Sequence, residues 1–138
     1  MRWEAALRAL GVPGLQVGGR EVPVPAGRAF ALLVYIAMYG QTGLDVLGPE
    51  VFPGVAAAGV RARVRAALPV VARWLGDPGA VTLQGQLVVP SPAWAWTVDA
   101  SEVLAGQGRA RGAFLPGLYS EWTGRVQDLL DTQAREAS

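Results

Sequence analysis

The two longest apolar patterns in the chain predict helices. Residues 26–39 are apolar on nearly every side of a helical projection, and Gly40 follows them as a C-terminal cap, as expected of a buried helix. Between Ala56 and Leu75, apolar residues recur at steps of three and four. This spacing predicts an amphipathic helix with one apolar stripe, made of Val60, Val64, Ala67, Leu68, Val71 and Leu75. Residues 42–52 have weaker helical spacing, and Gly48–Pro49 inside them makes any helix there short or bent.

Shorter stretches at both ends of this helical region predict strands. Residues 3–10 fit a strand or a short helix, because Trp and Leu favour the first and Ala the second, and we favour a strand. Residues 15–17 and 21–24 flank Gly18–Gly19 as the arms of a hairpin, so we expect a small antiparallel sheet at the N-terminus. Residues 81–89 alternate around Gly85, which predicts a second hairpin.

Two more helices are expected near the C-terminus. Asp99 and Glu102 have the spacing of a capping box, and we interpret both carboxylates as caps of a short helix rather than as a catalytic acid pair. A last helix is predicted from Ser120, with an apolar face formed by Trp122, Val126, Leu129 and Leu130. The order of strands and helices indicates an α+β fold.

The composition is that of a single folded domain. The chain has 138 residues, of which 51% are apolar and 17% charged, enough to bury a core. Its longest uninterrupted apolar run, residues 29–39, is well short of the roughly 20 residues that span a bilayer. We expect no signal peptide, because Glu4 follows the lone Arg2 closely and no apolar core comes after it. We therefore expect a cytoplasmic protein without a membrane partner.

Missing residue types narrow the chemistry. The chain has no Cys and no His, which excludes disulfides, thiolate nucleophiles, imidazole bases and the usual zinc ligand sets. No nucleophile and base pair, glycine-rich phosphate loop or metal-ligand cluster can be assembled from the other residues. We therefore expect no enzyme, no metal and no cofactor. All twelve basic residues are arginines, and with eleven acids they give a net charge of +1, which favours no particular partner.

Four arginines and no acid lie on the helix predicted over residues 56–75. In a helical projection at about 100° per residue, Arg65, Pro69 and Arg73 fall opposite the apolar stripe. Arg61 lies at the border of that face and Arg63 on its other flank. The helix is therefore expected to present a positively charged side.

Several segments resemble a known family of regulators. They are residues 19–25, 27–29 and 31–33, Val51–Phe52–Pro53, Val64–Arg65, Leu68, Arg73, Leu75–Gly76, residues 96–99 and residues 112–122. Together with the order of the elements, they resemble the response-regulator-type winged helix of antibiotic regulatory proteins and of other regulators with a bacterial transcriptional activator domain. The resemblance runs from about Leu15 to Arg135, and the stretch Gly112–Trp122 is its most specific part.

This resemblance implies both a fold and a function. It implies a winged helix-turn-helix domain over residues 1–98, with an antiparallel N-terminal sheet, three helices and a hairpin wing. Residues 99–138 would form a helical extension that resembles the start of the activator domain. The implied function is a transcriptional regulator that places the helix over about 56–75 in the major groove of double-stranded DNA. The expected DNA-binding residues are Arg61, Arg63, Arg65 and Arg73 on that helix, with Gln84 and Gln86 at the hairpin tip.

The sequence departs from the family pattern inside the proposed recognition helix. Pro69 predicts that this helix kinks, splits or starts late. Val70 and Ala72 stand where the family has two more arginines, so only Arg65 and Arg73 match its pattern cleanly. A second hypothesis is therefore a winged helix that has lost DNA binding and acts as a protein interaction or dimerisation module.

Three tryptophans bear on the second hypothesis. Trp94 and Trp96, expected in a loop, would form an exposed aromatic patch with Trp122 of the last helix. The commoner arrangement is that such tryptophans pack the last helix onto the domain. A homodimer, or a complex with a larger regulator, fits either hypothesis.

Overall fold

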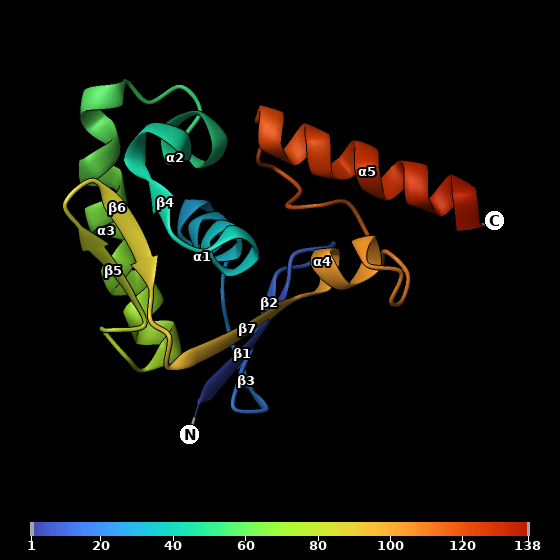
Figure 1. Ribbon diagram of the computed structural model, residues 1–138, viewed down its shortest axis with the longest axis horizontal. Coiled ribbons are helices and arrows are strands. Elements are labelled where there is room, and N and C mark those ends of the chain that lie inside the picture. Colours follow the sequence, from blue (N-terminus) through green and yellow to red (C-terminus); the bar gives the residue numbers. More distant parts are fainter. Residues whose placement is uncertain (1, 138) are drawn as a thin grey trace.

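The chain forms seven strands and five helices within residues 2–137, the part that this computed structural model describes (Figure 1). The first sheet contains β1 (Trp3–Arg8), β2 (Gly14–Val17), β3 (Arg20–Val22) and β7 (Trp94–Val98), and the second contains β4 (Thr42–Gly43), β5 (Val81–Gln84) and β6 (Leu87–Pro90). The helices are α1 (Arg28–Tyr39), α2 (Leu44–Val51), α3 (Ala57–Leu75), α4 (Asp99–Leu104) and α5 (Glu121–Ala137). The expected α+β class is confirmed.

The first sheet joins the two ends of the residue range 3–98. Its order is β3-β2-β1-β7, with β1 antiparallel to β2 and parallel to β7. The strand predicted over residues 3–10 and the antiparallel pairing of the β2–β3 hairpin are confirmed, and the parallel strand β7 adds to the expected sheet. The expected loop around Trp94 and Trp96 is instead strand β7, because Trp94 and Val98 are buried on the side that packs against α1.

The second sheet contains the predicted hairpin. Gln84 of β5 lies opposite Leu87 of β6, so the turn consists of Gly85 and Gln86. Gly85 has a φ of 63°, a left-handed conformation that glycine adopts easily in such tight turns. The backbone N–H of Leu44 donates to the carbonyl of Gln86 (2.9 Å), which fixes the hairpin to the start of α2.

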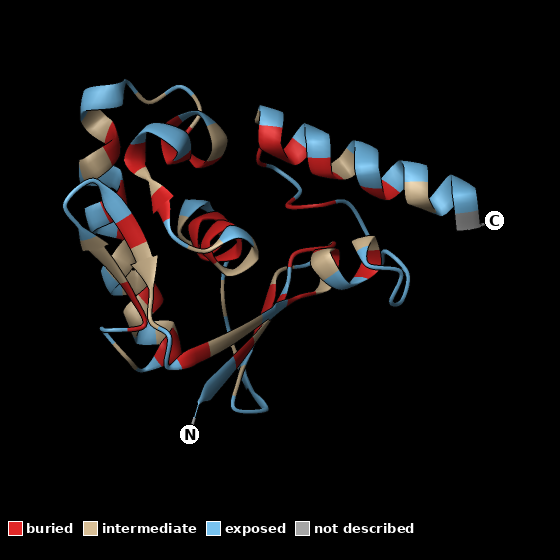
Figure 2. Ribbon diagram, viewed as in Figure 1, coloured by how far each residue is buried: buried red, intermediate tan, exposed pale blue. Residues whose placement is uncertain are grey.

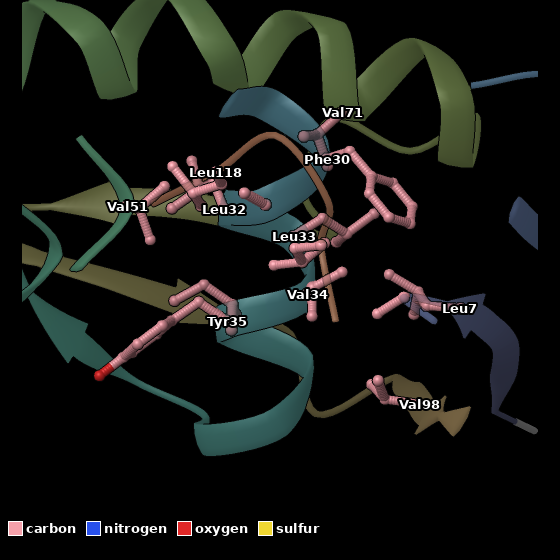
Figure 3. Close-up of a cluster of buried hydrophobic side chains, with 14 of the residues drawn as sticks. Leu7, Phe30, Leu32, Leu33, Val34, Tyr35, Val51, Val71, Val98 and Leu118 are labelled. Atoms are coloured by element: carbon pink, nitrogen blue, oxygen red, sulfur yellow. The ribbon is translucent and has the colours of Figure 1, made fainter. Parts of the chain in front are cut away.

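Helix α1 forms the centre of the core. Every residue from Phe30 to Ile36 is buried, and Figure 2 shows the helix enclosed by the other elements. In Figure 3, α1 side chains such as Phe30 and Val34 lie among Val71 of α3 and Leu7 of β1. Each such side chain contributes about 1.5–3 kcal/mol when fully buried. The helix predicted over 26–39 is confirmed in position and burial.

Both segments in which proline was expected to limit helix formation, residues 42–52 and 56–75, contain helices. α2 has eight residues, as the weak spacing predicted. α3 runs without interruption from Ala57 to Leu75 with Pro69 inside it, so the split or late start that we expected does not occur. Its apolar stripe is buried as predicted, with Leu68 half-buried. Gly76 caps the helix in the left-handed conformation, at φ 71° and ψ 21°.

Asp99 forms only part of the capping box that its spacing suggested. Its Oδ1 accepts the backbone N–H of Ala100 at the start of α4 (2.8 Å) and that of Ala9 (2.7 Å), and its Oδ2 accepts that of Leu10 (3.2 Å). Glu102 is exposed and does not cap α4, so the role predicted for Glu102 is wrong. Asp99 thus joins the end of β1 to the start of α4.

Helix α5 packs on α1 and α2 through a narrow stripe. Trp122 is completely buried, its indole N–H donates to the Tyr39 hydroxyl (3.0 Å), and its ring meets Tyr35 edge-on at a centroid distance of 4.7 Å. Val126 and Leu130 are also buried, but Leu129 is 56% exposed, which corrects its predicted place on the apolar face. A single helix lying on the surface buries only the residues directly beneath it, and Leu129 points away from the body.

The exposed aromatic patch of the second hypothesis is not formed. Trp94 is 3% exposed, and its indole N–H donates to Asp77 Oδ2 (2.7 Å). Trp96 is half-buried and stacks on Trp94, while Trp122 lies in the core. These tryptophans therefore hold elements together. None of the helices in residues 2–137 is long and apolar enough to cross a membrane.

Candidate nucleic-acid interface

The arginines of α3 face outward because the opposite side of the helix is fixed in the core. The buried stripe packs against α1 and α2, which leaves the other side open to solvent (Figure 2). The helix has no acidic residue along its length. Arg73 lies in its last turn, where the interaction of a positive charge with the helix dipole is stabilising. The exposed side of α3 therefore carries positive charge and no negative charge.

The four arginines differ in exposure and in their direction around the helix axis. Arg63, Arg65 and Arg73 are exposed and Arg61 is half-buried, and none of the four has a salt bridge or hydrogen bond within residues 2–137. With 3.6 residues per turn, Arg65 and Arg73 lie within about 80° of each other around the axis, with Pro69 between them. Arg63 lies about 160° from Arg65. A surface that meets Arg65 and Arg73 would reach Arg63 only at its edge.

A shallow groove separates the second half of α3 from β5. It is lined by Arg65 and Arg73 and by a mostly apolar set of residues: Leu68, Pro69, Ala72, Pro78, Val81, Thr82 and Leu83. The helical projection placed Arg65 and Arg73 on one face, but it gave no sign of the groove. The groove depends on where the hairpin docks, which the local spacing of residues does not show.

A second hollow brings Arg61 close to the hairpin turn. Arg61 and Gln86 line it together with Asp45 and apolar residues of α2 and of the loop that follows. Gln84 lies on the other side of the turn, where its amide donates to the Thr82 hydroxyl (3.1 Å). Of the predicted residues, Arg65 and Arg73 thus share one depression, Arg61 and Gln86 another, and Gln84 lies at the exposed hairpin tip.

Besides Asp45, which lines the hollow with Arg61, two acids lie near α3, and both are held by other groups. Glu50 of α2 lies 3.4 Å from the Arg125 guanidinium of α5. Asp77, just after α3, accepts the Trp94 indole N–H and the backbone N–H of Gly79 (2.9 Å). These two hydrogen bonds hold the pKa of the Asp77 carboxyl below its ordinary value, and the bond from the Trp94 indole has the larger effect. Both carboxylates are therefore engaged away from the α3 arginines.

The C-terminal segment leaves the arginine face open. In Figure 1, α5 lies on the far side of α1 from α3. Its contacts are with α2 and α4, and through Trp122 with α1. Residues 1–98 carry eight arginines and five acids, whereas residues 99–138 carry four arginines and six acids. The α3 arginines thus lie on the opposite side of α1 from α5.

Comparison with known proteins identifies the fold. No family model matches the chain, and no curated protein matches its sequence. Among solved structures, the chain is similar to Mycobacterium tuberculosis EmbR in complex with a low affinity phosphopeptide, with a TM-score of 0.67 and 16% identity. The match covers 99% of this chain and 44% of that chain, so this chain spans less than half the length of that protein. The likeness shows a winged-helix fold, in which β5 and β6 form the wing.

Proposed function

We propose that the chain binds double-stranded DNA as a transcriptional regulator, with α3 in the major groove and the β5–β6 wing near the backbone. The observation that supports this most strongly is the outward face of α3. It carries unpaired arginines and no acid, and no part of the chain within residues 2–137 covers it.

The dimensions of α3 suit a major groove. A helix of 19 residues is about 28 Å long, and the groove, about 12 Å wide, admits one helix. A guanidinium can neutralise a phosphate or grip the O6 and N7 atoms of guanine with two hydrogen bonds. Arg65 and Arg73, exposed on the same side, are the residues best placed for such contacts.

The wing supplies hydrogen bonds rather than charge. Its exposed tip, residues 84–87, contains two glutamines and no cation. Glutamine amides can donate to phosphate oxygens or to base edges, although they release no counterions from DNA. The salt dependence of binding should therefore come from the α3 arginines.

Binding of a labelled random-sequence duplex tests the proposal. Four phosphate contacts give a slope of log K against log salt of about −3.6, so affinity should fall about a hundredfold between about 50 and about 200 mM salt. The double variant Arg65→Ala/Arg73→Ala should reduce the magnitude of that slope by about two.

A matched control distinguishes contacts made by the α3 arginines from the effect of net charge alone. Arg20 and Arg109 are exposed arginines on β3 and on the loop before α5. The double variant Arg20→Ala/Arg109→Ala removes the same charge and should leave the slope unchanged. Lack of binding at about 50 mM salt, or an equal loss in the control, would overturn the proposed function.

A further inference from the structure

Between Arg65 and Arg73, the outer surface of α3 is small and apolar. Pro69 is exposed there, and alanines surround it at positions 62 and 66, both exposed, and 72, which is half-buried. The adjoining groove continues the apolar surface through Leu68 and Leu83. This centre has no side chain that can form a hydrogen bond, and its small residues would let the helix backbone approach a facing surface closely.

In a major groove, such a surface has one chemical counterpart. The C5-methyl group of thymine is the apolar group on the base edges, and alanine and other apolar side chains contact it. The Pro69 ring offers no donor or acceptor. Cytosine presents its amino group in the groove, and that donor would lose water against the ring without gaining a partner. In a major groove, an apolar surface of this kind therefore favours thymine over cytosine.

We propose that the centre of this face, led by Pro69, reads thymine methyl groups in DNA, with Arg65 and Arg73 on either side. This inference rests on the proposed function. Along the helix axis, the Cα atoms of Arg65 and Arg73 are about 12 Å apart, since each residue rises 1.5 Å. At about 3.4 Å per base pair, that interval covers three to four base pairs. The thymines that are read lie within it.

The experiment starts from sites selected by the whole chain from a random duplex library at about 50 mM salt. Each thymine of a selected site is then replaced by uracil, which removes only the methyl group, and the Kd is measured by fluorescence anisotropy. Loss of one buried methyl should weaken binding about fourfold. The effect is expected at one or two neighbouring positions and not elsewhere in the site.

The variant Pro69→Ser connects the methyl group to the proline. If the ring contacts the methyl, the variant binds thymine and uracil sites equally, because the contact is already lost. Pro25→Ser, in the exposed segment before α1, should keep the full uracil effect. Circular dichroism checks that both variants are folded, and the uracil effect in the unaltered chain stands even if Pro69→Ser does not fold.

The outcomes separate the two proposals. Failure to bind any duplex overturns the proposed function. Binding that is insensitive to uracil at every position overturns the reading of methyl groups while leaving DNA binding intact. A uracil effect that persists unchanged in folded Pro69→Ser overturns the role of Pro69.

Discussion

Replacement of Pro69 by alanine is expected to stabilise the fold. Pro69 lies inside a helix that is otherwise regular from Ala57 to Leu75. It has no N–H, so the carbonyl of Arg65 lacks its usual partner one turn later, and the ring crowds that carbonyl. Alanine supplies the N–H and fits the exposed position without a clash.

The size of the effect follows from two opposing terms. Proline is about 3 kcal/mol less favourable than alanine in a helix interior. It also restricts the unfolded chain, which offsets about 0.4–1 kcal/mol of that difference. The net gain in the free energy of unfolding is therefore about 2 kcal/mol. For 138 residues, an unfolding entropy of about 0.29 kcal/mol/K converts this gain into a rise in Tm of about 7 °C.

Thermal unfolding followed by circular dichroism measures the change, and urea unfolding checks it. Pro25→Ala is the matched control, because Pro25 is exposed and lies outside any helix or strand. Its Tm should fall by about 1–3 °C, because loss of this proline only removes the restriction of about 0.4–1 kcal/mol on the unfolded chain. An unchanged or lower Tm in Pro69→Ala would refute the view that this proline breaks an otherwise satisfied hydrogen-bond ladder.

Three further substitutions probe other contacts. Trp122→Ala should lower the free energy of unfolding in urea by about 3–5 kcal/mol, since it empties a buried ring site and leaves the Tyr39 hydroxyl without its donor. Asp99→Ala should lower it by about 1–3 kcal/mol, because two backbone N–H groups at the end of β1 lose their acceptor. Asp77→Asn should lower the Tm at pH 7 but not near pH 2. The folded-state pKa of Asp77 is lowered, so its contribution is present above the unfolded pKa of about 4 and is lost as pH falls through the folded value. An equal loss of Tm at both pH values would contradict that linkage.

Local patterns predicted the helices but not the non-local pairings. The stripe on α3 could be read from the sequence because residues three and four apart share a helical face. β7 could not be recognised in the same way, because its partner β1 lies about 90 residues away. Asp99 shows the same limit, since its spacing predicts the hydrogen bond with Ala100 but not those with Ala9 and Leu10 at the end of β1.

The candidate interface was predictable in part for the same reason. The burial of Val64 and Val71 requires Arg65 and Arg73 to face outward, as the helical projection indicated. The groove was not predictable, because it forms only where β5 docks beside α3. Pro69 was expected to disrupt the helix, but packing of the stripe on both sides of it keeps α3 continuous.

The parallel pairing of β1 with β7 affects how the protein is made. β1 is synthesised about 90 residues before β7, so one of its edges has no neighbour until residues 94–98 have been synthesised. Contacts between distant parts of a chain form slowly, and an unpaired strand edge favours aggregation. A nascent chain truncated before residue 94 should therefore be unable to complete its first sheet, which can form only after β7 has left the ribosome.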